Sequence, residues 1–156
     1  MNSPPKDTIQ RWSGERGGAY IELREGRVLV VSMEGHVDAS MGARVAEVLD
    51  KQLNRGAGFW TFWDLQRLQS YESETRLGFT RVLLGHRDGI VAIQVFAPSK
   101  VVRMGFAIAN VALGGRIKIH DERGSFLSAL GAAERLASRL EFQECLPPIG
   151  RRWAGG

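Results

Sequence analysis

The chain has a single cysteine and no long hydrophobic run, and both absences restrict what it can be. Cys145 cannot form a disulfide within the chain, so the sequence predicts a protein of a reducing compartment, the cytoplasm. No apolar stretch approaches the roughly 18 residues of a transmembrane helix, and the first residues lack the apolar centre of a signal peptide. We therefore expect no integral membrane segment.

Signatures of catalysis and of metal binding are also missing. His36, His86 and His120 are far apart, and none has a second His or Cys at metal-ligand spacing. There is no nucleophile elbow, Walker loop or dinucleotide fingerprint. Asp38 and Asp64 lie at predicted strand ends and could form a carboxylate pair, but no nucleophile or oxyanion site accompanies them. The sequence predicts a protein that is not an enzyme and has no cofactor or metal.

The charge pattern argues against nucleic acid as a partner. The chain has 21 Lys and Arg against 17 Asp and Glu, a net charge of +4. These charges are interspersed, whereas nucleic-acid binders usually gather Lys and Arg on one face. Arg151-Arg152 is the doubled basic pair, and a solvated tail explains it more simply than a phosphate or lipid contact.

What is present suffices for one α/β domain. The 156 residues are 44% hydrophobic, which suits a single core. Strand patterns occupy 19–23, 28–33, 59–63, 90–96 and 116–120, and the first two form a β-hairpin. Helical patterns follow at about 39–53, 74–85, 99–113 and 121–140. The order predicts a mixed, mostly parallel five-stranded sheet with an N-terminal β-hairpin and about four helices.

Apolar stripes predict which helix faces pack on the sheet. The expected N-caps are Asp38 or Ser40, then Ser99 and Asp121. The expected inner residues, helix by helix, are Met41, Val45, Val48, Leu49 and Leu53; Leu77, Val82, Leu83 and Leu84; Val101, Met104, Ile108 and Val111; and Phe126, Leu127, Leu130 and Leu136.

The ends of the chain differ from the middle in composition. Prolines, charges and paired glycines predict a flexible N-terminal arm at 1–18 and a C-terminal tail at 141–156, around a domain at 19–140. Trp12 is the exception in the arm. It either folds back onto the domain or enters a partner, and we favour folding back.

Several local phrases occur in a fixed order. Met33-Glu34-Gly35-His36-Val37-Asp38-Ala39 precedes the first helix, Asp64-Leu65-Gln66-Arg67-Leu68 follows the next strand, and Phe96-Ala97-Pro98-Ser99 and His120-Asp121-Glu122 precede the last two helices. Their order resembles the STAS domain family, that of bacterial anti-sigma-factor antagonists, over roughly residues 19–140. The resemblance implies a STAS-like single domain that is regulatory, not enzymatic, and binds a protein partner.

A possible phosphorylation site follows from the same resemblance. Phosphorylatable members have a D-S-S-G-L phrase whose first serine a partner kinase modifies, and here Glu72-Ser73-Glu74-Thr75-Arg76 stands in its place. Three interpretations stay open: Ser73 is only a helix N-cap, Ser73 is a phosphorylation switch, or Glu72 and Glu74 imitate a phosphate as fixed charges. The N-cap is the simplest.

The expected partner-binding segment is a loop from Trp63 to Ser73, because loops beyond strand ends are where α/β domains usually bind. Tyr71 is the expected hot spot. The resemblance implies a kinase-type anti-sigma factor or a larger signalling complex as partner. The candidate contact residues are Asp64, Arg67, Gln69, Ser70, Tyr71, Glu72 and Glu74.

Three alternatives stay open. The apolar helix at 101–113, with Gly105 and Phe106, could border a pocket for a small ligand or lipid, although a helix covering a sheet explains it too. The chain could be a scaffold without a phosphoswitch. It could also form a homodimer through the hairpin edge or through Trp12 and Trp153.

Overall fold

The computed structural model describes residues 8–145. The strands are β1 (Thr8–Ser13), β2 (Gly17–Arg24), β3 (Val28–Val37), β4 (Phe59–Tyr71), β5 (Ile90–Phe96) and β6 (Ile117–His120). The helices are α1 (Ala39–Leu53), α2 (Ser73–Gly85), the short 3₁₀ helix η1 (Arg87–Gly89), α3 (Lys100–Ala112) and α4 (Arg123–Cys145). Arg151-Arg152 and Trp153 lie outside the described residues.

One sheet holds all six strands in the order β1-β2-β3-β4-β5-β6. The first two pairings are antiparallel, and the pairings from β3 to β6 are parallel. The predicted α/β class, mixed sheet and N-terminal hairpin are confirmed, with six strands in place of five. The added strand is β1, in the segment expected to be an arm. Pairing with β2 stabilises it, and this support is invisible in the local composition.

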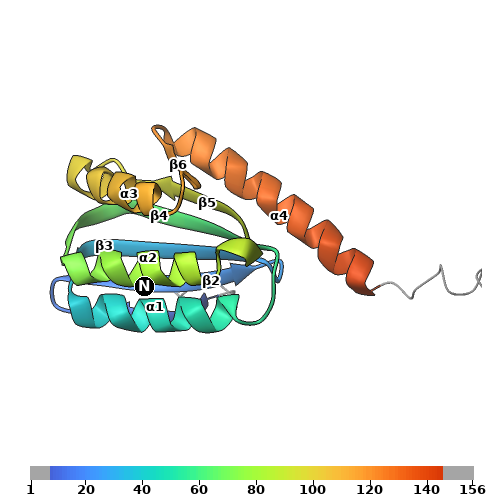
Figure 1. The fold of residues 1–156 in the computed structure, drawn as a ribbon, viewed down its shortest axis with the longest axis horizontal. Helices are drawn as coiled ribbons and strands as arrows, with labels where there is room; N and C mark the ends of the chain where they lie inside the picture. Colours follow the sequence, from blue (N-terminus) through green and yellow to red (C-terminus); the bar gives the residue numbers. More distant parts are fainter. Residues whose placement is uncertain (1–7, 146–156) are drawn as a thin grey trace, which may run out of the picture.

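The sheet separates two layers of helices (Figure 1). Alternate residues of β4 point to opposite faces, as the pleat requires. Trp63 meets Phe79 of α2 and Phe106 of α3, at ring-centroid distances of 5.0 and 6.0 Å. Phe62 meets Phe126 of α4 at 5.7 Å on the other face. Helices α1, α2 and α3 therefore share one face, and α4 covers part of the other.

Trp12 packs into the core on the face of α1 to α3. Its side chain is buried in the same cluster as Ile21 and Met33. The favoured prediction, that Trp12 folds back onto the domain, is confirmed. The indole supplies much of the apolar area that holds the edge strand β1 in place.

Two of the three predicted helix caps are confirmed. The Asp38 carboxylate accepts a hydrogen bond from the Met41 amide at 2.8 Å, and Ser99 Oγ accepts one from the Val102 amide at 3.5 Å. Asp121 is different, because its carboxylate pairs with Arg103 and α4 begins only at Arg123.

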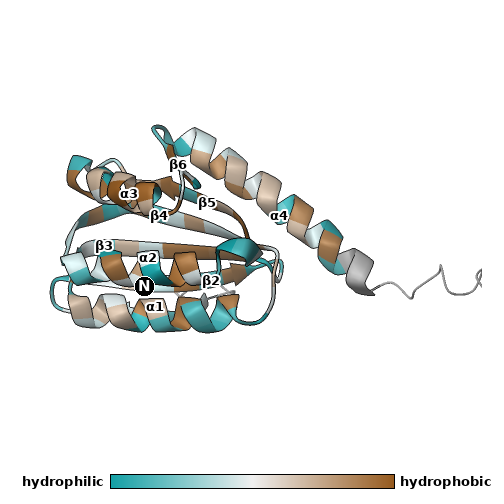
Figure 2. Cartoon of the chain, in the orientation of Figure 1, coloured by the Kyte–Doolittle hydropathy of each residue, from teal (hydrophilic) through white to brown (hydrophobic). Residues whose placement is uncertain are grey.

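The predicted inner stripe of α3 was wrong. Val101, Met104, Ile108 and Val111 are 64%, 65%, 53% and 83% exposed, and Val102, Gly105 and Ala109 face the core instead. Most of α3 is drawn in the brown of hydrophobic residues (Figure 2). Arg103 and Asn110 form a polar side of α3 that bonds to Asp121 and to the Ile117 amide. The rest of the helix is apolar, so periodicity does not decide which apolar side packs on the sheet.

The expected stripe is confirmed in α1 and only in part in α2 and α4. In α1 the stripe is confirmed, with Val45, Leu49 and Leu53 buried and Met41 and Val48 packed against them. Leu77 of α2 and Leu127 and Leu136 of α4 are exposed, contrary to prediction. Smaller or neighbouring residues take the inner positions: Thr75 and Phe79 in α2, and Ala133 and Ala137 in α4.

Candidate partner-binding site

The expected binding loop is the second half of strand β4. The strand runs through Tyr71, so placing Trp63 to Ser73 in a loop was wrong. Pairing with β5 ends at Asp64 and Phe96, and beyond that point β4 pairs with β3 alone. The local composition resembles a loop, but the long strand β3 supplies the hydrogen bonds that keep this segment extended.

Two irregularities decide which side chains β4 exposes here. Between the pairs Ser32–Asp64 and Glu34–Arg67, β4 has two residues where β3 has one. A second extra residue lies before Ser70. Bulges of this kind turn side chains out of the regular alternation. As a result Leu65 and Leu68 are buried, and the exposed side chains are Gln66, Arg67 and Gln69.

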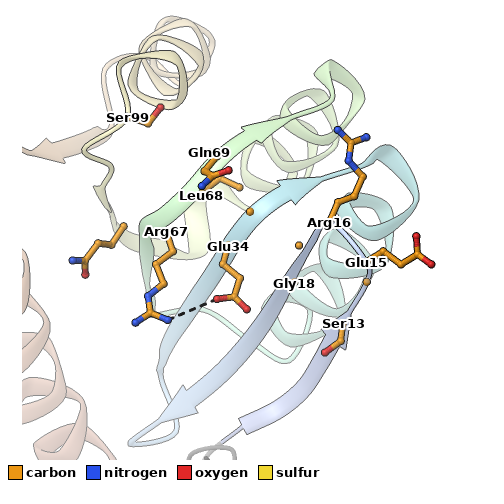
Figure 3. Close-up of a pocket in the computed structure, with 13 residues that line it drawn as sticks. Ser13, Glu15, Arg16, Gly18, Glu34, Arg67, Leu68, Gln69 and Ser99 are labelled. Carbon is orange, nitrogen blue, oxygen red and sulfur yellow. Dashed lines mark ion pairs between the residues drawn. The ribbon is translucent and has the colours of Figure 1, made fainter.

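These exposed residues border a shallow hollow of about 910 Å³. The β1–β2 turn forms the opposite wall, and Glu34 and Ser99 also reach it (Figure 3). The Arg67 guanidinium lies 4.0 Å from the Glu34 carboxylate, and both side chains are largely exposed. We call this hollow and its exposed residues Glu34, Gln66, Arg67 and Gln69 the rim surface.

Asp64 lies below the rim surface, on the sheet face that α4 partly covers. Both of its carboxylate oxygens accept hydrogen bonds from Arg123, at 3.0 and 2.9 Å. This pairing raises the pKa of Arg123. The Arg123 guanidinium also lies over the Phe96 ring, 5.7 Å from its centroid. Asp64 Oδ1 also accepts a hydrogen bond from the Gln66 amide at 3.4 Å, but the main partner of Asp64 is Arg123, the first residue of α4.

Asp64 belongs to a row of residues that crosses the whole sheet. Neighbouring strands place them side by side in the order Arg11, Tyr20, Ser32, Asp64, Phe96 and His120. The two ends differ: Arg11 is exposed above the Tyr20 ring, whereas His120 is buried and hydrogen-bonded to Gln94 and Ser125. Asp64 therefore lies where the open half of this face meets the half under α4.

The next two candidate residues are held by neighbours. Ser70 Oγ shares a hydrogen bond of 2.7 Å with His36 Nδ1 from β3. Tyr71 is half-buried, and its hydroxyl lies against Gly105 of α3. Burial raises the pKa of the Tyr71 phenol. The expectation of an exposed loop tyrosine was wrong, because the strand directs this ring between the helices.

The acidic residues and Ser73 lie at the start of α2 and are all exposed. Glu72 is the N-cap residue by backbone position, but its side chain makes no capping hydrogen bond. Ser73 is the first helical residue, so the N-cap interpretation of its hydroxyl was wrong. Thr75, two residues on, is buried and donates its hydroxyl to the Asp38 carbonyl at 3.2 Å. The backbone at Ser73 is thus held by α2, and its side chain is exposed.

The predicted carboxylate pair does not form. Asp38 caps α1, and Asp64 lies beside Ser32 on the opposite face of the sheet. The histidines are equally separate: His36 bonds Ser70, and His86 Nε2 lies 2.7 Å from Asp50. The described residues bring none of these groups together in a catalytic arrangement.

Sequence reasoning missed Glu34 and Arg123 as parts of this region. Both come from distant segments, and only strand register and the position of α4 bring them to β4. One signal was present for the adjacent turn. Gly35 has φ +66°, and a Cβ there would lie 2.3 Å from the Arg16 carbonyl, which explains the glycine of the first phrase.

Comparison with known proteins supports the fold. No family model matches the sequence, and no curated protein matches it. Among solved structures, the anti-sigma factor antagonist SpoIIAA in its unphosphorylated form is 21% identical, with a TM-score of 0.52 over 72% of this chain and 96% of SpoIIAA. The chain has the STAS fold.

Two further structures agree with this STAS assignment. SpoIIAA in its phosphorylated form, described as a Bacillus cell fate determinant, is 19% identical with a TM-score of 0.51, covering 71% of this chain and 98% of that one. A DUF3478 protein of SpoIIAA-like fold from Shewanella loihica PV-4 is 15% identical with a TM-score of 0.56, covering 76% and 97%. The predicted resemblance is confirmed at the level of the STAS fold.

Proposed function

We propose that this STAS-like domain is a non-enzymatic regulatory module that binds a protein partner through the rim surface and the first turn of α2. The observation that carries the proposal is the bulged end of β4, which exposes Gln66, Arg67 and Gln69 on a rigid strand. Bulges are frequent where a strand presents side chains for function. A strand also positions contact residues with less loss of entropy on binding than a mobile loop.

The chemistry of the surface suits a polar partner of mixed charge. Arg67 and Glu34 offer opposite charges only 4.0 Å apart, and Glu72 and Glu74 continue the exposed surface along the chain. Such charge patterns favour selection of a partner and its orientation more than raw affinity. Asp64, Ser70 and Tyr71 support the surface from behind through Arg123, His36 and Gly105.

Ser73 is the proposed switch of this surface. Its hydroxyl is exposed on the first residue of α2, where the free amides and the dipole of the helix favour a phosphate. Glu72 and Glu74 flank it and oppose the added charge. The same two carboxylates would also repel a partner that prefers the unmodified surface. This repulsion would be weaker than that from a phosphate on Ser73. A kinase-type anti-sigma factor is the proposed partner, and SpoIIAA itself is known in both phosphorylated and unphosphorylated forms.

The test is capture of a partner by tagged protein from the native cell extract, followed by repetition with the purified partner. Wild type, Ser73→Ala, Ser73→Asp and Arg67→Glu are compared, with intact-mass analysis of each. Arg139→Glu is the matched control for the rim, because Arg139 is exposed on α4. We expect Arg67→Glu to lose capture and Arg139→Glu to keep it.

The serine variants test the switch separately. A phosphate on the wild type that is absent from Ser73→Ala, with loss of capture by Ser73→Asp, is the expected result. Equal capture by all serine variants without modification would remove the switch and leave a binding module. Equal capture by Arg67→Glu and Arg139→Glu would remove the rim surface from the proposal.

A further inference from the structure

Helix α3 carries an apolar stripe that faces away from the protein. Val101, Met104, Ile108 and Val111 follow helical spacing, and each is more than half exposed. We call these four residues the outer face of α3. Single exposed hydrophobic residues are common on protein surfaces, but four in one helical stripe are not.

The domain does not need this stripe for its own packing. Val102, Gly105 and Ala109 turn to the core, and Phe106 fills the space beside Trp63. An internal ligand does not explain the stripe either, because the apolar cavity between α2 and α3 holds only about 20 Å³. That is room for about one water molecule. The outer face is therefore available to something outside the domain.

The charge around α3 is mostly positive. From the start of α2 at Ser73 to His120 the chain has seven Lys and Arg and two acidic residues, Glu74 and Asp88. The whole sequence has a net charge of only +4. The excess of basic over acidic residues is therefore concentrated in this segment. This segment comprises α2, β5, α3 and β6, so α3 belongs to the most basic part of the chain.

Several of these cations are placed to act beside the stripe. Lys100 is exposed at the first position of α3, and Arg81 is exposed on α2, the helix that contacts α3. Arg76 packs against α3, with its Cδ 3.4 Å from the position of a Cβ added at Gly105. Arg103 pairs with Asp121, the first acidic residue after the segment. An apolar stripe within a basic surround fits an anionic partner.

We propose that the outer face of α3 docks on an anionic lipid surface. A second copy of the chain is disfavoured, because pairing two such faces would bring like charges together. An acidic protein would need a groove shaped for a projecting helix, whereas lipid headgroups and acyl chains adapt to one. Apolar insertion and basic attraction together are the two signals that reversible membrane binding generally requires.

The contact is peripheral, and it is separate from the rim surface. Among the helices of residues 8–145, none is long and apolar enough to cross a membrane. Docking through α3 would place the domain on the membrane with its own core intact. Apart from Ser99, the N-cap of α3, the rim surface belongs to β3, β4 and the β1–β2 turn, so the two proposals can fail independently.

Co-sedimentation with vesicles tests the proposal. Vesicles of phosphatidylcholine alone are compared with vesicles that also contain phosphatidylglycerol, at low and at raised salt. We expect the full chain to sediment with the anionic vesicles, to bind the neutral ones weakly, and to be released by salt. Met104→Glu and Val111→Glu should each lower the bound-to-free ratio by about tenfold, because an acidic side chain replaces an inserted apolar one.

The matched control is Leu136→Glu, the same kind of change at a half-exposed residue of α4. It should bind like wild type, and unfolding midpoints should show that all variants are folded. Val111 is the most exposed of the four, so Val111→Glu alone suffices if Met104→Glu does not fold. Absence of binding to anionic vesicles, or equal binding by Val111→Glu and Leu136→Glu, would overturn the proposal. A wild-type dimer that Val111→Glu dissociates would instead make this face a self-interface.

Discussion

The Tyr71 hydroxyl lies where a side chain at position 105 would be. A Cβ added to Gly105 would be 1.6 Å from this oxygen and 2.8 Å from the ring carbon that bears it. The end of β4 and the middle of α3 thus approach each other as closely as they do because residue 105 is a glycine. This contact connects the strand that exposes the rim surface with the helix that exposes the apolar stripe.

Gly105→Ala should destabilise the domain by about 1–3 kcal/mol, because the added methyl forces Tyr71 to move. Gly78→Ala is the matched control, since a Cβ there meets nothing within 4 Å in the neighbouring helix α2. Alanine should stabilise that helical position by about 0.5–1 kcal/mol. Urea unfolding measures both. Equal effects of the two substitutions would contradict the close contact.

The Asp64–Arg123 pair should couple the sheet to α4 by about 1 kcal/mol in a double-mutant cycle of Asp64→Asn and Arg123→Gln. Both side chains are partly exposed, which keeps the figure modest. Arg123→Lys should not restore the coupling, because lysine cannot bind both oxygens in parallel. The exposed Glu47–Lys51 pair of α1 serves as reference, with an expected coupling below about 0.5 kcal/mol. A coupling free energy no larger than that of the reference pair would show that the Asp64–Arg123 pair does not couple the sheet to α4.

His120 should make the stability of the domain depend on pH. Burial lowers the pKa of its imidazole, Lys118 lowers it further, and Asp121 opposes both. The unfolded chain then takes up a proton near pH 6.5, while the folded chain takes it up only at lower pH. The contribution is complete above about pH 6.5 and is lost as the pH falls below that value.

His120→Gln removes this contribution while keeping a polar side chain beside Gln94. Unfolding free energies from about pH 5 to pH 8 should therefore decline less steeply toward acid in the variant than in the wild type. Parallel curves would mean that His120 titrates alike in both states. A lower stability of the variant at every pH would not by itself bear on the prediction.

The orientation of α3 can be tested with two valines of the same helix. Val102 is fully buried, and Val111 is 83% exposed. Val102→Ala should cost about 1–3 kcal/mol of stability through a cavity, and Val111→Ala should change it by less than about 0.5 kcal/mol. Thermal or urea unfolding of both variants gives the comparison. A larger loss at Val111 would restore the orientation that periodicity predicted.

The sequence by itself determined the α/β class, the order of helices and strands from β2 onward, and the caps at Asp38 and Ser99. These features depend on residues close together in the chain: alternating apolar residues, helical stripes, and polar side chains one turn before an amide. The STAS resemblance was detectable for the same reason, because its phrases mark strand ends and helix starts.

Tertiary structure alone decided the features that matter most for the candidate sites. The segment after Asp64 is a strand because β3 pairs with it, although its composition resembles a loop. Strand β1 exists because β2 supports it. Helix α3 has apolar residues on both its inner and its outer side, so only its contacts with the sheet determined that Val102 faces inward and Val111 outward. In each case the deciding hydrogen bonds or contacts come from residues distant in sequence, and a local pattern cannot contain them.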